Sequence, residues 1–212
     1  MPSADEIDAV TVDAFGTLVE LREPYDRLRE ALGERGVARD RSAVARAFAA
    51  EVAYYLPRAH EGRDPDSLGQ LRRDCAAVFL TALEANIDPA EFAPAFVASL
   101  EFRPLPGATS ALERLGAAGL TLACVANWDV SLPDHLAGAG LSGFFAAFVT
   151  SAEAEARKPD PRPFELALNR VGIEPERALH IGDSDADRDG AHAAGLAFEP
   201  APLATLPARL GL

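Results

Sequence analysis

The sequence is almost devoid of lysine. Among its 20 lysine and arginine residues, Lys158 is the single lysine, and every other basic residue is arginine. A lysine ammonium is a compact point charge with three rotatable donors, whereas an arginine guanidinium is a wide planar fork. The one position that keeps lysine is therefore a candidate for a role that arginine cannot fill.

Positive charge as a whole is scarce. The 33 acidic residues outnumber the basic ones and give a formal net charge of −13. Nucleic acids and anionic membranes are bound by basic surfaces, so the composition argues against either as a partner. If the protein binds a phosphate group, it must do so through a local cationic site.

Long hydrophobic runs and cysteine pairs are also missing. The longest apolar stretch, residues 120–126, is far too short to span a bilayer. The first residues contain no basic segment before an apolar run, which predicts that there is no signal peptide. Cys75 and Cys124 lie in apolar surroundings without metal-ligand spacing, as expected for buried free thiols. Together these features predict a cytoplasmic protein.

Apolar strands alternate with helical segments in two parts of the chain. A helix is expected at residues 108–118, and another between Pro161 and Gly172, a proline and glycine pair typical of helix ends. Strands are expected at residues 7–12, 120–126, 144–150, 178–181 and 196–198. Apolar strands in such alternation are typical of a parallel sheet covered on both faces. We therefore predict an α/β fold with a doubly wound parallel sheet, formed by residues 1–19 and 104–212.

The segment between these parts contains helical patterns only. Helices are expected at residues 24–32, 42–56, 68–86 and 89–100. Asp40 or Ser42 is the expected N-cap of the second helix, and Asp66 or Ser67 that of the third. An all-helical insert in an α/β core predicts a separate cap, at residues 20–103.

Two aspartates stand at the ends of predicted strands. Asp13 ends the first strand and Asp183 ends a later one, and ligands bind at the carboxyl ends of strands in such sheets. Two carboxylates brought together repel each other unless a cation joins them. Oxygen ligands favour Mg²⁺, and Lys158 follows a third strand, where it would add positive charge. This combination suits phosphoryl transfer, in which catalysis is mostly positioning and charge neutralisation.

The order and spacing of four motifs resemble those of the haloacid dehalogenase-like (HAD) hydrolase superfamily, with its α-helical type of cap. The motifs are Asp13-Ala-Phe-Gly-Thr17-Leu18, Val125-Ala-Asn127, Lys158-Pro-Asp-Pro and Gly182-Asp183-Ser-Asp-Ala-Asp187. The resemblance covers nearly the whole chain and implies a HAD-like Rossmannoid core. It also implies a small-molecule substrate, most readily a small phosphorylated metabolite, for a protein that is a monomer or a homodimer.

The resemblance also implies roles for individual residues. Asp13 would be the nucleophile that forms a covalent aspartyl intermediate. Mg²⁺ would be held by Asp13, the backbone carbonyl of Phe15 and Asp183. Lys158 would neutralise the nucleophile and the phosphoryl oxygens. Asp187 would orient Lys158 or a metal-bound water. Thr17 of the first motif would contact the catalytic and metal-binding residues without touching the substrate itself.

The sequence departs from the pattern of the phosphatases in this superfamily at two positions. Phe15 stands where they usually carry an acid/base aspartate, a group worth roughly 10²–10⁴ in rate. Ala126 stands where a serine or threonine usually donates to a phosphoryl oxygen, a bond worth about 1.5–3 kcal/mol. The amide of Asn127 could still donate there, so we expect Asn127 to be a catalytic residue. Trp128 is a candidate substrate contact.

Phe15 leaves two alternatives open. L-2-haloacid dehalogenases of the superfamily carry an aromatic residue at this position and displace halide with the aspartate, without metal. A metal-independent 2-haloacid dehalogenase is therefore the second hypothesis. The third is a catalytically degenerate HAD fold that serves as a binding protein. The sequence identifies neither the substrate nor the oligomeric state.

Overall fold

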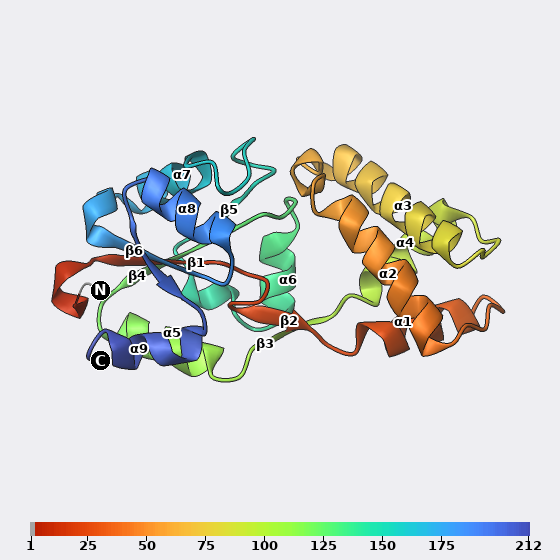
Figure 1. The fold of residues 1–212 in the computed structure, drawn as a ribbon, viewed down its shortest axis with the longest axis horizontal. Coiled ribbons are helices and arrows are strands. Elements are labelled where there is room, and N and C mark those ends of the chain that lie inside the picture. Colours follow the sequence, from red (N-terminus) through yellow and green to blue (C-terminus); the bar gives the residue numbers. More distant parts are fainter. Residues whose placement is uncertain (1–2) are drawn as a thin grey trace. The chain divides into compact units, whose positions relative to one another are not determined.

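The chain folds into two compact units. The structure is a computed structural model that describes residues 3–212 (Figure 1). The first unit contains the residues up to Glu20 together with Phe102–Leu212, and the second is Leu21–Glu101. The chain therefore passes from one unit to the other at two places.

A parallel sheet forms the centre of the first unit. In the described residues it has five strands in the order β5-β4-β1-β6-β7, and all neighbours are parallel. The strands are β1 (Ala9–Val12), β4 (Thr121–Ala126), β5 (Ala147–Thr150), β6 (Ala178–Gly182) and β7 (Ala197–Pro200). This sheet, with helices between its strands, confirms the predicted α/β fold class. The order places β1 in the middle, with β4 and β6 as its neighbours.

Helices cover both faces of this sheet (Figure 1). On one face, α5 (Ala108–Ala117), α6 (Leu132–Gly138) and α9 (Leu206–Arg209) join an apolar cluster with the side chains of Val10, Val12 and Leu122. On the other face, α7 (Arg162–Val171) and α8 (Asp185–Ala193) pack against Ala9, Ala123 and Val125. Apolar neighbours on both faces explain why β1 and β4 are nearly continuous hydrophobic runs.

Some boundaries in the first unit differ from the prediction. The expected strand at residues 144–150 begins only at Ala147, because Ser142–Phe144 forms a 3₁₀ turn. The aromatic side chains of Phe144 and Phe145 still pack on the core from this turn, which gave the segment its apolar, strand-like pattern. Helix α6 and the short two-stranded sheet of β2 (Val19–Leu21) and β3 (Phe102–Pro104) were not predicted.

The second unit is helical. Its helices α1 (Pro24–Gly33), α2 (Arg41–Tyr55), α3 (Pro65–Ala82) and α4 (Pro89–Ala98) enclose an apolar cluster that contains the stacked rings of Phe79 and Phe92. Apart from Leu21, the last residue of β2, the elements of this unit are helices, as the sequence patterns indicated.

One predicted helix cap in this unit is right and the other is wrong. Asp40 caps α2 and accepts a hydrogen bond from the Ala43 amide. Helix α3 begins at Pro65 and is capped by Asp64, not by Asp66 or Ser67. The Asp64 carboxylate accepts from the amides of both residues, and proline fits the first helical position because it lacks an N–H.

Within residues 3–212, no helix is long and apolar enough to cross a bilayer.

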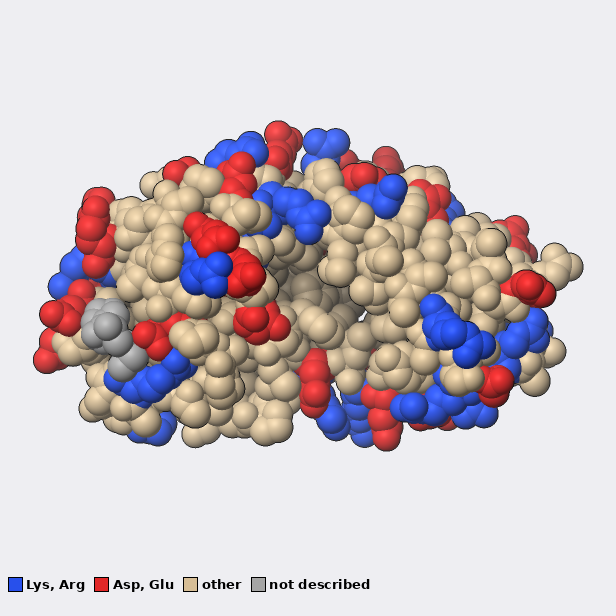
Figure 2. Space-filling model, viewed as in Figure 1, with Lys and Arg blue, Asp and Glu red and all other residues tan. Residues whose placement is uncertain are grey.

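On the face drawn in Figure 2, arginine and acidic side chains lie intermixed. Among the described residues many arginines pair with acids, as Arg188 does with Asp185 and Asp189. The face drawn in Figure 2 accordingly shows no continuous basic surface.

Candidate active site

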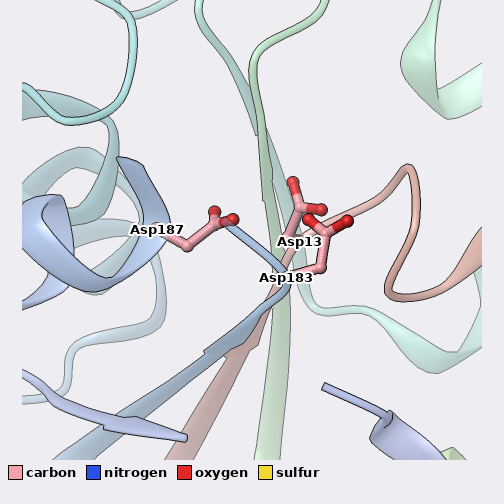
Figure 3. A group of neighbouring side chains, drawn as sticks. All are labelled: Asp13, Asp183 and Asp187. Carbon is pink, nitrogen blue, oxygen red and sulfur yellow. The ribbon is translucent and has the colours of Figure 1, made fainter. Parts of the chain in front are cut away.

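The site begins at the ends of two adjacent strands, β1 and β6. Val12 is in register with Ile181, and the amide of Asp13 donates to the Ile181 carbonyl at 2.9 Å. Asp13 and Asp183, which follow these strands, consequently bring their carboxylates close together (Figure 3). The strand order changes direction at β1, which is the point of a doubly wound sheet where ligands bind.

Lys158 joins this group from the loop between β5 and α7. Its Nζ lies 2.6 Å from Oδ1 of Asp13, 2.5 Å from Oδ1 of Asp187 and 2.8 Å from the carbonyl oxygen of Val125. All three ammonium protons therefore have acceptors. The side chain is only 3% exposed, so a compact head group is required here, and the wide fork of arginine would not fit.

The charges of the cluster shift one another's pKa values. Burial acts to lower the pKa of the Lys158 ammonium, but the carboxylates of Asp13 and Asp187 outweigh burial and raise it. For Asp187, burial acts to raise the pKa, but the hydrogen bond from His180 and the charge of Lys158 hold it well below its usual range. Burial raises the pKa of Asp13, and the charge of Asp187 adds to this effect against the opposing charge of Lys158. Lys158 is therefore protonated and Asp187 ionised.

Asp187 holds the Lys158 ammonium through a hydrogen bond. Its Oδ1 accepts from Lys158 and from Nε2 of His180, and its Oδ2 accepts from the amide and the hydroxyl of Ser184. Ser184 is also the N-cap of α8, whose first turn holds Asp187. Because both oxygens are engaged, Asp187 is better placed to hold the lysine than to bind a cation.

Asp13 and Asp183 are the carboxylates that could hold a metal ion. Asp13, Asp183 and Asp187 each offer an oxygen within 4.8 Å of the others (Figure 3). Burial, followed by the charge of Asp187, raises the pKa of Asp183. Three carboxylates with one ammonium leave an excess of negative charge, which a divalent cation with a preference for oxygen would offset. The donor set of the site therefore fits such an ion.

The loop after Asp13 passes close to the carboxylate of Asp183. Gly16 has a φ of +86°, and a Cβ placed there would lie 2.2 Å from Oδ2 of Asp183. Only glycine lets the backbone pass so close to this carboxylate in the left-handed region. Phe15, whose carbonyl the family resemblance assigns to the metal, directly precedes Gly16 in this loop. Phe15 as a whole residue is 51% exposed, which is unusual for so large an apolar residue.

Asn127 lies in the site but its amide is engaged. Its Nδ2 donates to the carbonyl of Lys158 at 3.1 Å, and its Oδ1 accepts from the Lys158 amide at 2.8 Å. The bond to the Lys158 carbonyl uses one of the two hydrogens of Nδ2, so the donation to substrate that we expected from this amide stays a prediction. Asn127 holds the backbone of the lysine, and we describe it as a positioning residue.

The remaining predicted site residues occupy apolar surroundings. Trp128 is 8% exposed and packs edge-on against Phe102, with His135 also beside it, so it offers little surface to a substrate. Ala126 is buried in the same apolar cluster. The hydroxyl of Thr17 is buried and finds no hydrogen-bond partner among residues 3–212.

His180 belongs to the site but is not among the residues that the sequence predicted. This residue lies in β6, fully buried, and contacts Asp187 through one ring nitrogen and Thr11 through the other. Thr11 and His180 are direct partners in the pairing of β1 with β6. The signal that could have pointed to His180 is a polar residue inside an apolar strand that leads into the Gly182-Asp183 motif.

Comparisons with known proteins identify the family of the chain. The family model of haloacid dehalogenase-like hydrolases matches residues 7–195. The chain belongs to this family.

Individual relatives show how far the similarity of this HAD hydrolase extends. It is 40% identical over 102 residues to the mouse (Mus musculus) haloacid dehalogenase-like hydrolase domain-containing protein 3. This alignment covers 48% of this chain and 41% of that protein. It is 34% identical over 203 residues to the phosphoglycolate phosphatase of Rhodospirillum rubrum. This alignment covers 89% of this chain and 76% of that protein. The chain thus spans less than two thirds of the mouse relative and most of the bacterial one.

A solved structure with the same fold is the L-2-haloacid dehalogenase of Xanthobacter autotrophicus. The identity is 26%, the TM-score is 0.67, and the alignment covers 91% of this chain and 76% of that one. Proteins similar to this HAD hydrolase therefore include one named as a phosphatase and one named as a dehalogenase.

Proposed function

We propose that the protein is a Mg²⁺-dependent phosphohydrolase that acts on a small phosphorylated metabolite. The observation that carries the proposal is the placement of the Lys158 ammonium between Asp13 and Asp187, with Asp183 beside them. An ammonium and a metal ion next to a carboxylate suit the attack of that carboxylate on a phosphoryl group, whose charge must be neutralised.

In this reaction an oxygen of Asp13 attacks phosphorus, and the bond from phosphorus to the leaving oxygen breaks. The leaving group departs with the electron pair of that bond. Lys158 holds the carboxylate in place and neutralises charge on the phosphoryl oxygens. Water then attacks the phosphorus of the aspartyl phosphate, which releases phosphate and restores Asp13. Mg²⁺, held by Asp13, Asp183 and the carbonyl of Phe15, would supply further neutralisation of the phosphoryl charge.

The leaving group is expected to be one that needs no proton. Phe15 follows Asp13 by two positions and has no group that can transfer a proton. Acyl and aryl phosphates have leaving groups that depart as anions, so they should react faster than alkyl phosphates. For the same reason the attack of water on the aspartyl phosphate should be slow, which predicts a burst of product. A matched series of alkyl and aryl phosphates with no dependence on the leaving group would contradict this part.

Beryllofluoride binding tests the proposal without a known substrate, since it mimics a phosphorylated aspartate. We expect calorimetry to detect Mg²⁺-dependent binding to the wild type and none to Asp13→Asn. The matched control is Asp185→Asn, which removes an exposed carboxylate of α8 and should bind as the wild type does. Absence of binding to the wild type, or undiminished binding to Asp13→Asn, would refute the phosphoryl site.

The exposed phenyl ring of Phe15 favours one alternative, a 2-haloacid dehalogenase. There the Asp13 oxygen would attack the carbon that bears the halogen and displace halide, without metal. Halide release that persists in a chelator and disappears in Asp13→Asn would establish this reaction. Halide release that requires Mg²⁺, or none at all, would exclude it.

We interpret the helical unit, Leu21–Glu101, as a cap that sets substrate specificity.

We also propose a cytoplasmic location for the protein. Cys75 and Cys124 are buried and form no disulfide among the described residues, and reduced thiols are usual in a reducing compartment.

A further inference from the structure

His180 is a buried titratable residue that the proposed reaction does not use. Its ring is completely buried in β6, with Nδ1 2.8 Å from the hydroxyl of Thr11 and Nε2 3.2 Å from Oδ1 of Asp187. The same Oδ1 accepts from Lys158, which in turn contacts Asp13. A continuous series of hydrogen bonds therefore connects the middle of the sheet to the nucleophile.

The partners of His180 determine where its proton lies. An ionised carboxylate can only accept, so Nε2 must carry the hydrogen that faces Asp187. Burial lowers the pKa of the imidazole against the effect of Asp187, which keeps the ring neutral. Nδ1 is then a lone pair that accepts the Thr11 hydroxyl proton. If Thr11 donated instead to the carbonyl of Leu179, at 3.4 Å, a bare Nε2 would face a buried carboxylate, which is unfavourable.

Apolar packing alone does not account for a histidine here. The ring meets Phe164 edge-on, with centroids 4.8 Å apart, and lies near Phe198. A leucine or methionine could fill such a space without the cost of burying two polar atoms. Both ring nitrogens instead have partners whose donors and acceptors match one neutral tautomer.

We propose that His180 is a positioning residue for Lys158. Ser184 fixes Oδ2 of Asp187. The Nε2 hydrogen of His180 fixes Oδ1, which is the oxygen that accepts from the Lys158 ammonium, in the orientation that this contact requires. Without that donor the carboxylate is free to turn about its Ser184 contacts, and Lys158 loses its fixed orientation toward Asp13. The consequence for turnover rests on the proposed function, whereas the consequence for Lys158 does not.

Two amide substitutions separate the ring nitrogens. In His180→Gln the side-chain nitrogen occupies the place of Nε2 and can donate to Asp187, whereas in His180→Asn it occupies the place of Nδ1 and cannot reach Asp187. Both replace the ring with a smaller amide, so they lose similar packing. Phe198→Leu is the control for packing alone, because it alters the surroundings of the ring and leaves its hydrogen bonds intact.

The single lysine makes its geometry directly observable. Protein labelled with ¹⁵N-lysine has one side-chain ammonium resonance, that of Lys158, whose shift and exchange rate report its hydrogen bonds. We expect His180→Asn to shift this resonance and to accelerate its exchange with water by about tenfold or more. His180→Gln and Phe198→Leu should keep both close to the wild-type values. Thr11→Val should move the resonance in the direction of His180→Asn, and it serves as the test if His180→Asn does not fold.

Turnover provides the second measurement. With an aryl phosphate, kcat should fall about tenfold in His180→Asn at little change in KM, and His180→Gln should restore most of it. A lysine resonance unchanged in both His180→Asn and Thr11→Val would overturn the inference. If wild type neither binds beryllofluoride nor turns over aryl phosphates, the proposed function fails while the lysine resonance still tests the role of His180.

Discussion

Asn127 and Lys158 exchange two hydrogen bonds, from the Asn127 amide nitrogen to the Lys158 carbonyl and from the Lys158 amide to the Asn127 amide oxygen. This pair fixes the backbone of the lysine, while Asp13, Asp187 and the Val125 carbonyl fix its ammonium. Lys158 is therefore held at both ends of its side chain. Val125 and Asn127 of the second motif thus contact Lys158, which in turn contacts Asp13, the proposed nucleophile.

Asn127→Ala should loosen this end of the lysine. It removes both hydrogen bonds and leaves a partly buried peptide group without its partner, so we expect the free energy of unfolding to fall by about 1–3 kcal/mol. Turnover of aryl phosphates should fall as well. Urea denaturation and steady-state kinetics measure the two effects. Asn169→Ala, which removes an exposed asparagine from α7, is the control and should change neither. Wild-type stability and kcat in Asn127→Ala would contradict the positioning role.

Phe15→Asp should give the site the acid/base group that it lacks. If the missing proton transfer limits the reaction, the substitution should accelerate the hydrolysis of alkyl phosphates by about 10²-fold and that of aryl phosphates much less. The ratio of the two rates is the measurement. Phe15→Asn has nearly the same shape without the titratable carboxyl, so it should leave the ratio near that of the wild type. Equal ratios in the two variants would show that Phe15 does not limit proton transfer.

Much of the fold could be predicted because local patterns encode it. The apolar runs that became β1, β4 and β6 are buried on both faces, and Gly172 ends α7 in the left-handed conformation that favours glycine. Asp13 and Asp183 could be placed together because adjacent parallel strands end at the same edge of a sheet. These inferences need only periodicity, turn chemistry and the general order of an α/β sheet.

The parts that could not be predicted depend on contacts between distant segments. The link from His180 to Asp187 requires the register of β1 against β6, which places Thr11 opposite His180. The engagement of Asn127 depends on a loop 31 residues away. The pairing of β2 with β3 joins segments separated by the whole helical unit, and each strand is too short to show a period. A single sequence contains no direct signal for such pairings.

Glu51 predicts a pH dependence of stability that comes from the helical unit. The carboxyl is buried in α2, and burial raises its pKa to about 7 from 4.5, against the opposing hydrogen bond of the Cys75 thiol. The folded state thus holds a proton that the unfolded state releases between these values. The stability that this proton contributes is fully present below pH 4.5 and is lost as the pH rises through about 7. At pH 8 the buried charge should therefore destabilise the fold by up to about 3 kcal/mol.

Glu51→Gln tests this dependence because it keeps an acceptor for the thiol and removes the charge. It should raise the unfolding free energy at pH 8 and change it little near pH 4.5, as measured by urea denaturation across the range. Glu30→Gln, at an exposed position of α1, is the matched control and should show no such trend. A difference between Glu51→Gln and wild type that stays constant with pH would show that Glu51 does not titrate in this way.

Gly16→Ala should weaken metal binding although it replaces no side chain of the site. The new methyl group would lie 2.2 Å from Oδ2 of Asp183, so the carboxylate or the loop must move. We expect the affinity for Mg²⁺, measured by calorimetry with beryllofluoride, to fall by about tenfold or more, as is typical when the support of a metal ligand is disturbed. Gly140→Ala separates this crowding from backbone strain, since Gly140 also has a positive φ of +74° but no atom within 4 Å of the added carbon. Both variants should lose stability through the left-handed conformation, and only Gly16→Ala should lose affinity. Equal affinities in the two variants would mean that the closeness of Gly16 to Asp183 does not serve the metal site.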